Sequence, residues 1–354
     1  METTTEFIIR KANQSKIQGV DFNKLEFGKH VSDHMLVCDF KNEEWQNPQI
    51  VPFANLSISP TALALHYGQT VFEGMKAFRM HDDRINVFRI EKHYERFVIS
   101  LERMCMPAPP LEVFAEGLMK LIEIDKKWVP SQTNTALYIR PFVFATEERF
   151  GVKISSDYRF IVFTGPVGKL YTRSIKVKVE TNYTRAAKGG TGFTKCGGNY
   201  GASFYPTQKA RKEGYDQVLW TDGESHQFIE ESGMMNVMFV IDGVLVTPPL
   251  CETILDGITR DSILQIAKDA GCKIEQRPEN ISELKNAFHN KTITEAAGIG
   301  TAAVVLPIAT IGINGTDHHL PEYSHENILE KLKQKLERIR TGVDDDIYGW
   351  NHIV

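Results

Sequence analysis

The 354-residue chain lacks the features that mark secreted, membrane-spanning or nucleic-acid-binding proteins. No stretch approaches the roughly 20 consecutive apolar residues that a membrane-spanning helix needs. The formal net charge of −4 offers no basic surface for nucleic acid. The first sixteen residues, METTTEFIIRKANQSK, have no apolar signal core. We therefore predict a cytoplasmic protein that binds neither nucleic acid nor membrane.

Cysteine is scarce and its pattern is uninformative for pairing. The five cysteines stand at positions 38, 105, 196, 251 and 272, with no Cys-x-x-Cys among them. An odd, scattered set predicts reduced thiols instead of a disulfide framework or a zinc site. We therefore predict no bound metal. Internal repeats and low-complexity segments are also absent from the sequence, so we predict no repeat architecture.

The length predicts about two domains, since one domain usually takes about 150 residues. Strand and helix patterns alternate without one regular βαβ period, which favours an α/β or α+β fold with mixed sheets and flanking helices. Gly165-Pro-Val-Gly168 interrupts the pattern. We predict an N-terminal α/β domain over 1–164, a linker over 165–174, and a C-terminal α/β domain over 175–354 that carries Lys195.

Periodicity and turn residues predict the individual elements. Helices are predicted over 89–104, 112–125, 202–212 and from 256 to 270, and Asn280 with Glu283 forms a capping box for another. Strands are predicted over 34–39, 135–140, 158–163, 175–179 and 217–220, with hairpins 75–80/84–89 and 236–241/244–247.

The densest chemical signal is the segment KGGTGFTKCGGNYGAS, residues 188–203. Glycines on both sides of Lys195 permit close approach to the main chain. A phosphate-binding P-loop is excluded because it needs Gly-Lys-Ser/Thr in succession, and Thr194 precedes Lys195. A Schiff-base lysine tuned by a nearby residue such as Tyr200 fits the segment. From residue types alone, a surface loop with a solvated lysine remains the alternative.

Two glycine turns and one acid accompany this lysine. Gly257-Ile258-Thr259 begins a helix, whose free N–H groups bind anions, and Gly298-x-Gly300-Thr301 offers a second nest of amides. The second turn also fits a loose G-x-G-x-x-A dinucleotide pattern, but too little chain follows to build that fold. Glu231, with Glu230 beside it, leads into a strand. A lysine, a tyrosine, anion cradles and an acid are together the parts of a pyridoxal phosphate site.

Motifs along nearly the whole chain resemble the branched-chain-amino-acid aminotransferases, which are fold-type IV pyridoxal phosphate enzymes. The matching segments are FGKHVSDHM (27–35), LHYGQTVFEGMKAF (65–78), LYIRP (137–141), residues 188–203, QVLW (217–220), IEESGMMN (229–236), VTPPL (246–250) and GTAAVV (300–305). The resemblance implies a two-domain homodimeric transferase that acts on small amino acids and 2-oxo acids.

The resemblance also implies roles for individual residues. It makes Lys195 the Schiff-base lysine, Tyr200 the partner of the cofactor's phenolic oxygen, and Glu231 the partner of its ring nitrogen. The implied phosphate cradle consists of Arg96, Ile258, Thr259, Gly300 and Thr301. The implied substrate pocket consists of Phe27, Tyr67, Tyr138, Arg140 and Ala302. Met234 departs from the threonine of some relatives, and Ala303 and Leu306 replace the Cys-x-x-Cys of mammalian members.

Other functions stay open at this point. A D-amino-acid aminotransferase or an aminodeoxychorismate lyase would share the fold, although FGKHVSDHM and LYIRP favour the branched-chain enzymes. A non-catalytic phosphate- or nucleotide-binding protein could use the same glycine turns. The sequence does not distinguish among leucine, isoleucine and valine as the preferred substrate.

Overall fold

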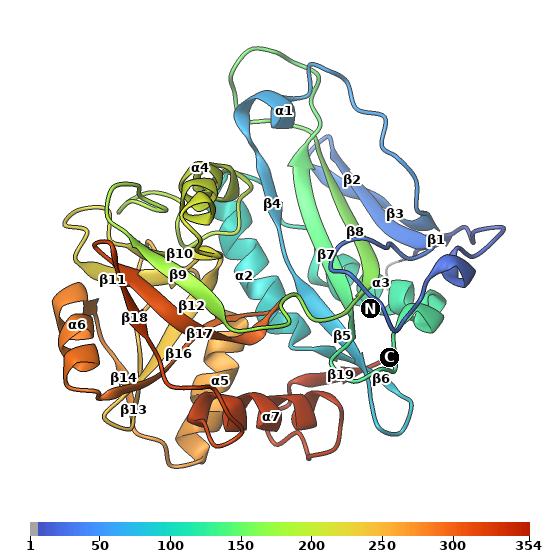
Figure 1. The fold of residues 1–354 in the computed structure, drawn as a ribbon. Helices are drawn as coiled ribbons and strands as arrows, with labels where there is room; N and C mark the ends of the chain where they lie inside the picture. Colours follow the sequence, from blue (N-terminus) through green and yellow to red (C-terminus); the bar gives the residue numbers. More distant parts are fainter. Residues whose placement is uncertain (1–5) are drawn as a thin grey trace. The chain divides into compact units, whose positions relative to one another are not determined.

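The computed structural model describes residues 6–354, which divide into two compact units (Figure 1). Unit 1 contains the chain up to Leu170, together with Lys195–Gly198 and Ile339–Val354. Unit 2 contains Tyr171–Thr194 and Asn199–Arg338. The first five residues, part of the N-terminal stretch considered above, lie outside the described residues.

Unit 1 is built on a nine-stranded sheet with the order β1-β3-β2-β8-β7-β5-β6-β19, in which β4 also pairs with β7. Its strands are β1 (Ile8–Ile9), β2 (His34–Lys41), β3 (Glu44–Pro52), β4 (Thr70–Phe72), β5 (Met75–Arg79), β6 (Ile85–Phe88), β7 (Ala136–Ala145), β8 (Tyr158–Val167) and β19 (Asn351–Ile353). Successive residues of β2 enter different apolar clusters, Leu36 and Cys38 in one, Met35 and Val37 in the other. This alternation shows that both faces of the sheet are covered.

The helices of unit 1 are α1 (Leu63–Tyr67), α2 (Ile90–Arg103) and α3 (Leu111–Ile124). The three- and four-residue apolar spacing predicted for α2 and α3 places Phe97 and Leu101 of α2 with Phe114 and Leu118 of α3 in the larger cluster. Both helices, and the hairpin of β5 and β6, are confirmed within one or two residues.

Unit 2 is built on a ten-stranded mixed sheet with the order β14-β13-β12-β16-β17-β9-β10-β11-β15, in which β18 pairs with β17. Its strands are β9 (Ile175–Glu180), β10 (Gln217–Thr221), β11 (Phe228–Ser232), β12 (Met235–Ile241), β13 (Val244–Thr247), β14 (Ile274–Gln276), β15 (Glu279–Asn280), β16 (Ile293–Gly300), β17 (Val304–Ile313) and β18 (Thr316–His319). The accompanying helices are α4 (Gly198–Lys212), α5 (Ile258–Asp269), α6 (Ile281–His289) and α7 (Ile328–Arg340).

Local turn and cap chemistry in unit 2 agrees with the sequence. Asp242 and Gly243 both have positive φ, 50° and 73°, as the two-residue hairpin between β12 and β13 requires. Asn280 and Glu283 form the predicted capping box at the start of α6. The two sheets and their accompanying helices confirm the predicted α/β fold class.

Two local predictions are corrected. Gly165 was expected to break the strand pattern, but it lies within β8. Glycine is needed there because a Cβ would lie 2.1 Å from the carbonyl oxygen of His30. Gly298 is likewise a strand residue of β16, where the missing side chain leaves room for Met235, so the turn begins only at Thr301.

The division of the chain also differs from the one expected. The chain first passes from unit 1 to unit 2 between Leu170 and Tyr171, inside the predicted linker. Lys195–Gly198 and the C-terminal Ile339–Val354, however, belong with unit 1. The reason is strand pairing, since Cys196 forms an antiparallel bridge with Val71 of β4, and β19 pairs with β6.

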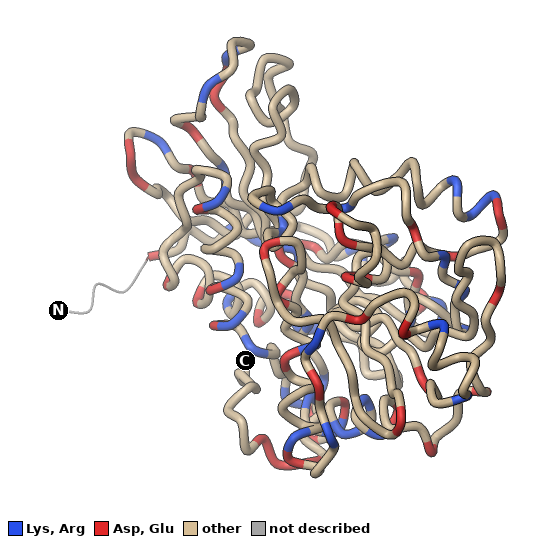
Figure 2. Tube along the Cα trace, turned by 90° about the vertical axis from the view of Figure 1, so that its left-hand side faces the viewer, with Lys and Arg blue, Asp and Glu red and all other residues tan. Residues whose placement is uncertain are grey.

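Charge is spread evenly along the chain. Figure 2 shows Lys and Arg interspersed with Asp and Glu over the described trace, without one sign gathering in one part. Within residues 6–354, no helix has the length and apolar character needed to cross a bilayer.

Candidate active site

Lys195 sits on a four-residue segment of unit 1 that pairs with the strand β4. The backbone N–H of Phe72 donates to Lys195 O at 3.1 Å, and that of Gly197 donates to Thr70 O at 3.0 Å. The backbone N–H of Lys195 donates to Ser100 Oγ at 3.0 Å. Its ammonium lies 4.8 Å from the centroid of the Phe72 ring. The lysine is therefore anchored at its main chain, with its charge over an aromatic face.

Arg96 is held by a buried carboxylate in unit 1. Its Nε and Nη2 donate to the two oxygens of Glu73 at 2.7 and 2.8 Å. The Glu73 carboxylate also accepts from the backbone N–H of Gly74 at 3.0 Å and from His93 Nδ1 at 2.9 Å. This fork-on-fork geometry fixes the plane of the guanidinium.

The ionisation of this cluster follows from its contacts. Burial alone would raise the pKa of Glu73, but the charge of Arg96 and the hydrogen bonds from His93 and Arg96 lower that pKa well below its usual range. Burial lowers the pKa of His93 to about 4. His93 is therefore neutral near pH 7, with the proton on Nδ1, because an ionised Glu73 can only accept.

Aromatic rings surround Arg140 on β7. Its Nη2 donates to Tyr138 Oη at 3.1 Å, and its guanidinium carbon lies 4.7 Å from the Phe72 ring centroid. The rings of Phe27 and Tyr138 meet edge to face with centroids 5.0 Å apart. A Cβ on Gly74 would come within 2.1 Å of Tyr138 Oη, so only glycine leaves room for that hydroxyl. One guanidinium thus stands in a largely apolar wall.

Tyr67 is held by different contacts. This residue is 42% exposed on α1, its hydroxyl donates to Phe150 O, and its ring lies near His66. Among the described residues, the structure therefore joins Phe27, Tyr138 and Arg140 into one cluster and places Tyr67 outside it.

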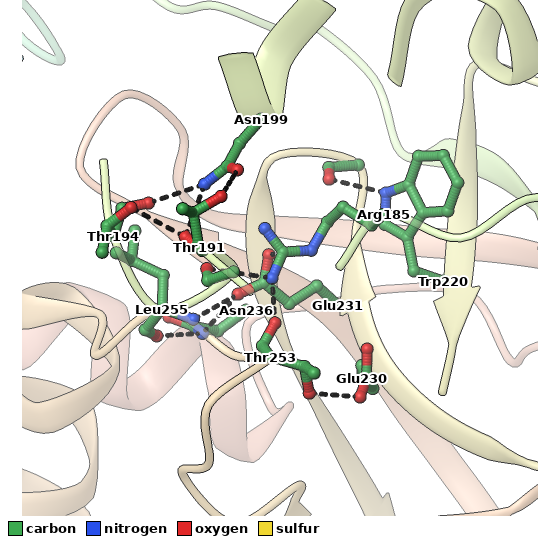
Figure 3. A network of polar contacts seen from close by, with 12 residues as sticks. Arg185, Thr191, Thr194, Asn199, Trp220, Glu230, Glu231, Asn236, Thr253 and Leu255 are labelled. Atoms are coloured by element: carbon green, nitrogen blue, oxygen red, sulfur yellow. Dashed lines mark hydrogen bonds and ion pairs between the residues drawn. The ribbon is translucent and has the colours of Figure 1, made fainter. Parts of the chain in front are cut away.

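Glu231 is the centre of a polar network in unit 2 (Figure 3). Arg185 Nε lies 3.2 Å from Glu231 Oε2, while the backbone N–H of Leu255 donates to Oε1 at 2.9 Å. Asn236, its cross-strand neighbour on β12, approaches Oε1 at 3.5 Å and donates to Leu255 O at 2.9 Å. The carboxylate is only 3% exposed. An arginine and a backbone amide therefore hold this carboxylate in a buried position.

Glu230, its neighbour on β11, has another environment. Its Oε1 accepts from the hydroxyl of Thr253, and burial raises its pKa. Consecutive strand residues point to opposite faces, so the two carboxylates serve different surroundings. The geometry supports Glu231 as the acid that faces a ligand.

A hollow in unit 2 adjoins this acid. It is lined by Arg185, Thr194, Asn199, Tyr200, Ser203, Glu231, Gly233, Met234 and Leu255. Tyr200 of α4 and Glu231 of β11 therefore line the same hollow. Met234, which also lines this hollow, is 52% exposed.

The anion site predicted for unit 2 lies at the start of α5. A Cβ on Gly257 would meet Asn236 Oδ1 at 1.8 Å, so glycine is required there. Ile258 and Thr259, each 2% exposed, follow as the first helical residues. Gly300 ends β16, and Thr301 and Ala302 form the turn after it. These backbone amides suit a phosphate.

The predicted site residues thus fall into two sets. Unit 1 carries Lys195, Arg96, Phe27, Tyr67, Tyr138 and Arg140, and unit 2 carries Tyr200, Glu231, Ile258, Thr259, Gly300, Thr301 and Ala302. Sequence reasoning missed the supporting residues Glu73, His93, Ser100 and Arg185. None of the four lies in a pattern that separates it from an ordinary surface or core residue.

The comparisons with known proteins show the family to which the chain belongs. Residues 70–311 match the family described as amino-transferase class IV. A probable branched-chain-amino-acid aminotransferase of Staphylococcus epidermidis is 42% identical over 335 residues, covering 93% of each chain. Branched-chain-amino-acid aminotransferase 2 of Bacillus subtilis is 41% identical over 334 residues, covering 93% of this chain and 92% of the relative.

Solved structures show the same fold. The branched-chain amino acid aminotransferase from Escherichia coli superimposes with a TM-score of 0.72 at 26% identity, covering 90% of this chain and 98% of its own. A second branched-chain amino acid aminotransferase, solved with pyridoxamine 5′-phosphate, gives a TM-score of 0.73 at 25% identity, covering 90% and 97%. The chain belongs to the class IV aminotransferases, and among them to the branched-chain-amino-acid aminotransferase family. Enzymes of this fold type use pyridoxal 5′-phosphate.

Proposed function

We propose that this enzyme transfers the amino group between L-leucine, L-isoleucine or L-valine and 2-oxoglutarate, giving branched-chain 2-oxo acids and L-glutamate. Its cofactor is pyridoxal 5′-phosphate. When bound, that group supplies an electron sink for the charge left on the substrate Cα after proton loss.

The residues present fit this cofactor. Lys195 provides a primary amine to hold it covalently and, once released, to take the α-proton at Nζ and return it. Arg96 and the start of α5 provide donors for a phosphate. Glu231, paired with Arg185, would accept a hydrogen bond from the ring nitrogen of the cofactor, and Tyr200 would donate one to its phenolic oxygen.

The substrate assignment rests on one observation, the guanidinium of Arg140 among aromatic rings. The Nε of Arg140 is buried and has no hydrogen-bond partner among the described residues. A ligand carboxylate would satisfy that donor, as glutamate and 2-oxoglutarate require. The faces of Phe72 and Tyr138 present apolar surface to a branched aliphatic side chain. One wall thus suits both substrates.

An assay of amino donors with 2-oxoglutarate tests this proposal. Purified holoenzyme is incubated with single L- or D-amino acids, and glutamate formation is followed. The three branched-chain L-amino acids should be the best donors. Preference for D-alanine, or release of 4-aminobenzoate from aminodeoxychorismate, would assign the chain to another fold-type IV activity. Light scattering should give the mass of a homodimer.

A further inference from the structure

The segment that carries Lys195 is tied together at its two ends by one side chain. Lys195–Gly198 belongs to unit 1, while the flanking residues Thr194 and Asn199 belong to unit 2. Asn199 Nδ2 donates to the carbonyl oxygen of Thr194 at 3.0 Å. The residue after the segment therefore holds the residue before it (Figure 3).

The same amide also holds the preceding turn. Asn199 Nδ2 donates to Thr191 O at 2.8 Å, and Asn199 Oδ1 accepts from Thr191 Oγ1 at 2.7 Å. Thr194 Oγ1 donates to Thr191 O at 2.7 Å. Both hydrogens of the Asn199 amide and its oxygen are thus engaged on residues before Lys195.

That turn is itself fixed within unit 2. A Cβ on Gly192 would lie 2.8 Å from Thr253 Cα, so the backbone packs too closely for a side chain. Arg185 donates to Gly192 O at 3.2 Å, and the Phe193 N–H donates to Glu252 O at 3.1 Å. Asn199 therefore fastens the end of the Lys195 segment to a rigid base.

We infer that Asn199 is a positioning residue that sets the place of Lys195 by closing the base of its segment. The inference rests on the proposed function of Lys195. It needs an amide at this position, because an aspartate has nearly the same shape but no hydrogen to donate to two carbonyl oxygens. Displacement of a reacting group by about 1 Å can cost about 100-fold in rate.

The test measures how fast Lys195 captures the cofactor, which does not depend on turnover. The full-length apoprotein is mixed with pyridoxal 5′-phosphate and quenched with borohydride at successive times, and the label on Lys195 is quantified by peptide mass. Asn199→Ala and Asn199→Asp should slow labelling by about 10- to 100-fold. Thr191→Val removes one of the bonds to Asn199 and should slow labelling less than either.

Two controls make the outcome specific. Asn182→Ala changes an exposed asparagine of the same unit and should label at the wild-type rate. Urea unfolding of each apoprotein reports global stability. Slower labelling of Lys195 in a variant that remains folded supports the positioning role of Asn199. Slower labelling that is fully explained by the unfolded fraction of the variant overturns that role. If Asn199 variants fail to fold, Thr191→Val decides, and wild-type labelling by it contradicts the inference.

The two levels of failure are distinguishable. If Lys195 of the wild-type protein carries no label, the proposed function itself is refuted. Wild-type label on Lys195 together with unchanged rates in Asn199→Ala and Asn199→Asp would refute only the role of Asn199.

Discussion

The two units hold charged groups of opposite sign by the same device. In unit 1 a cation, Arg96, is gripped by the buried acid Glu73. In unit 2 an acid, Glu231, is gripped by the mostly buried cation Arg185. Each pair balances its own charge before any ligand arrives, since an unpaired buried charge costs several kcal/mol. Each unit therefore neutralises, within its own fold, the charge of the residue that we propose as a cofactor contact.

The units differ in how they support the main chain at Lys195 and at Glu231. Glu231 belongs to a regular strand whose neighbour Asn236 is fixed by register. Lys195 lies in a four-residue segment that belongs to unit 1, although the residues on either side of it belong to unit 2. This segment pairs with β4. The position of the Lys195 amine thus depends on both ends of a short segment, whereas the position of the Glu231 carboxylate depends on one sheet.

The largest effect is expected from removing the amine of unit 1. Lys195→Ala should abolish transamination while the protein still folds and binds pyridoxal 5′-phosphate through its phosphate contacts. Activity assays and equilibrium dialysis of the cofactor measure the two properties. Lys188→Ala, an exposed lysine seven residues earlier, is the matched control. Activity remaining in Lys195→Ala would break the assignment.

Next comes the acid of unit 2. Glu231→Gln should lower kcat by about 10²–10⁴, because a neutral amide cannot keep the ring nitrogen protonated. Glu230→Gln should cost far less, since that carboxylate faces Thr253. Steady-state kinetics of the two variants give the comparison. Equal losses of kcat in the two variants would contradict the choice of Glu231, and not Glu230, as the acid that contacts the ring nitrogen.

The acid of unit 1 should act on stability. Glu73→Gln leaves Arg96 without its counter-charge and should lower the unfolding free energy by about 3–5 kcal/mol at neutral pH. Because the folded pKa values of Glu73 and His93 are depressed, their contribution is present above the unfolded values and lost on acidification. The window lies below about pH 6.5 for His93 and below about pH 4.3 for Glu73.

Urea unfolding across that range measures this effect. The wild-type unfolding free energy should fall steadily as the pH drops, and Glu73→Gln should show a shallower fall. Glu95→Gln, on the same helix α2 but exposed, should match the wild type. Parallel curves for wild type and Glu73→Gln would show that the buried pair does not govern acid stability.

A smaller, selective effect is expected at Arg140. Arg140→Leu should reduce kcat/KM for glutamate and 2-oxoglutarate by about 1.5–3 kcal/mol in transition-state free energy, the worth of a hydrogen bond to a charged group. Leucine has no second carboxylate and should lose less. Parallel kinetics with leucine and glutamate as donors measure the difference. An equal loss for both would assign Arg140 to packing.

No effect is expected from mild oxidation. Ala303 and Leu306 leave no thiol pair after the turn of unit 2, and Cys196 beside Lys195 is buried. Peroxide should modify the exposed Cys105 and Cys251 while transamination continues at its initial rate. Rapid inactivation that Cys196→Ala resists would show that the lysine segment is open to reagents.

Much of this architecture could be read from local sequence rules. Apolar spacing predicted α2 and α3, Asp242-Gly243 predicted its hairpin, and Asn280 with Glu283 predicted a cap, because each depends on neighbouring residues. The glycine setting of Lys195 likewise pointed to close backbone packing, which Gly192 shows directly.

The rest depends on contacts between distant segments. Gly165 and Gly298 looked like turn residues, but each lies in a strand where another segment takes the place of a side chain. The membership of Lys195 in unit 1 follows from pairing with residues about a hundred positions earlier or more. Glu73 and Arg185 gave no signal, because a single charged residue has no periodicity to read.

The most direct test of the account is to reduce the wild-type holoenzyme with borohydride and map the modified peptide. The account predicts loss of the yellow colour and one phosphopyridoxyl group on Lys195. A label on Lys188 or on another lysine, or no stable label at all, would contradict it.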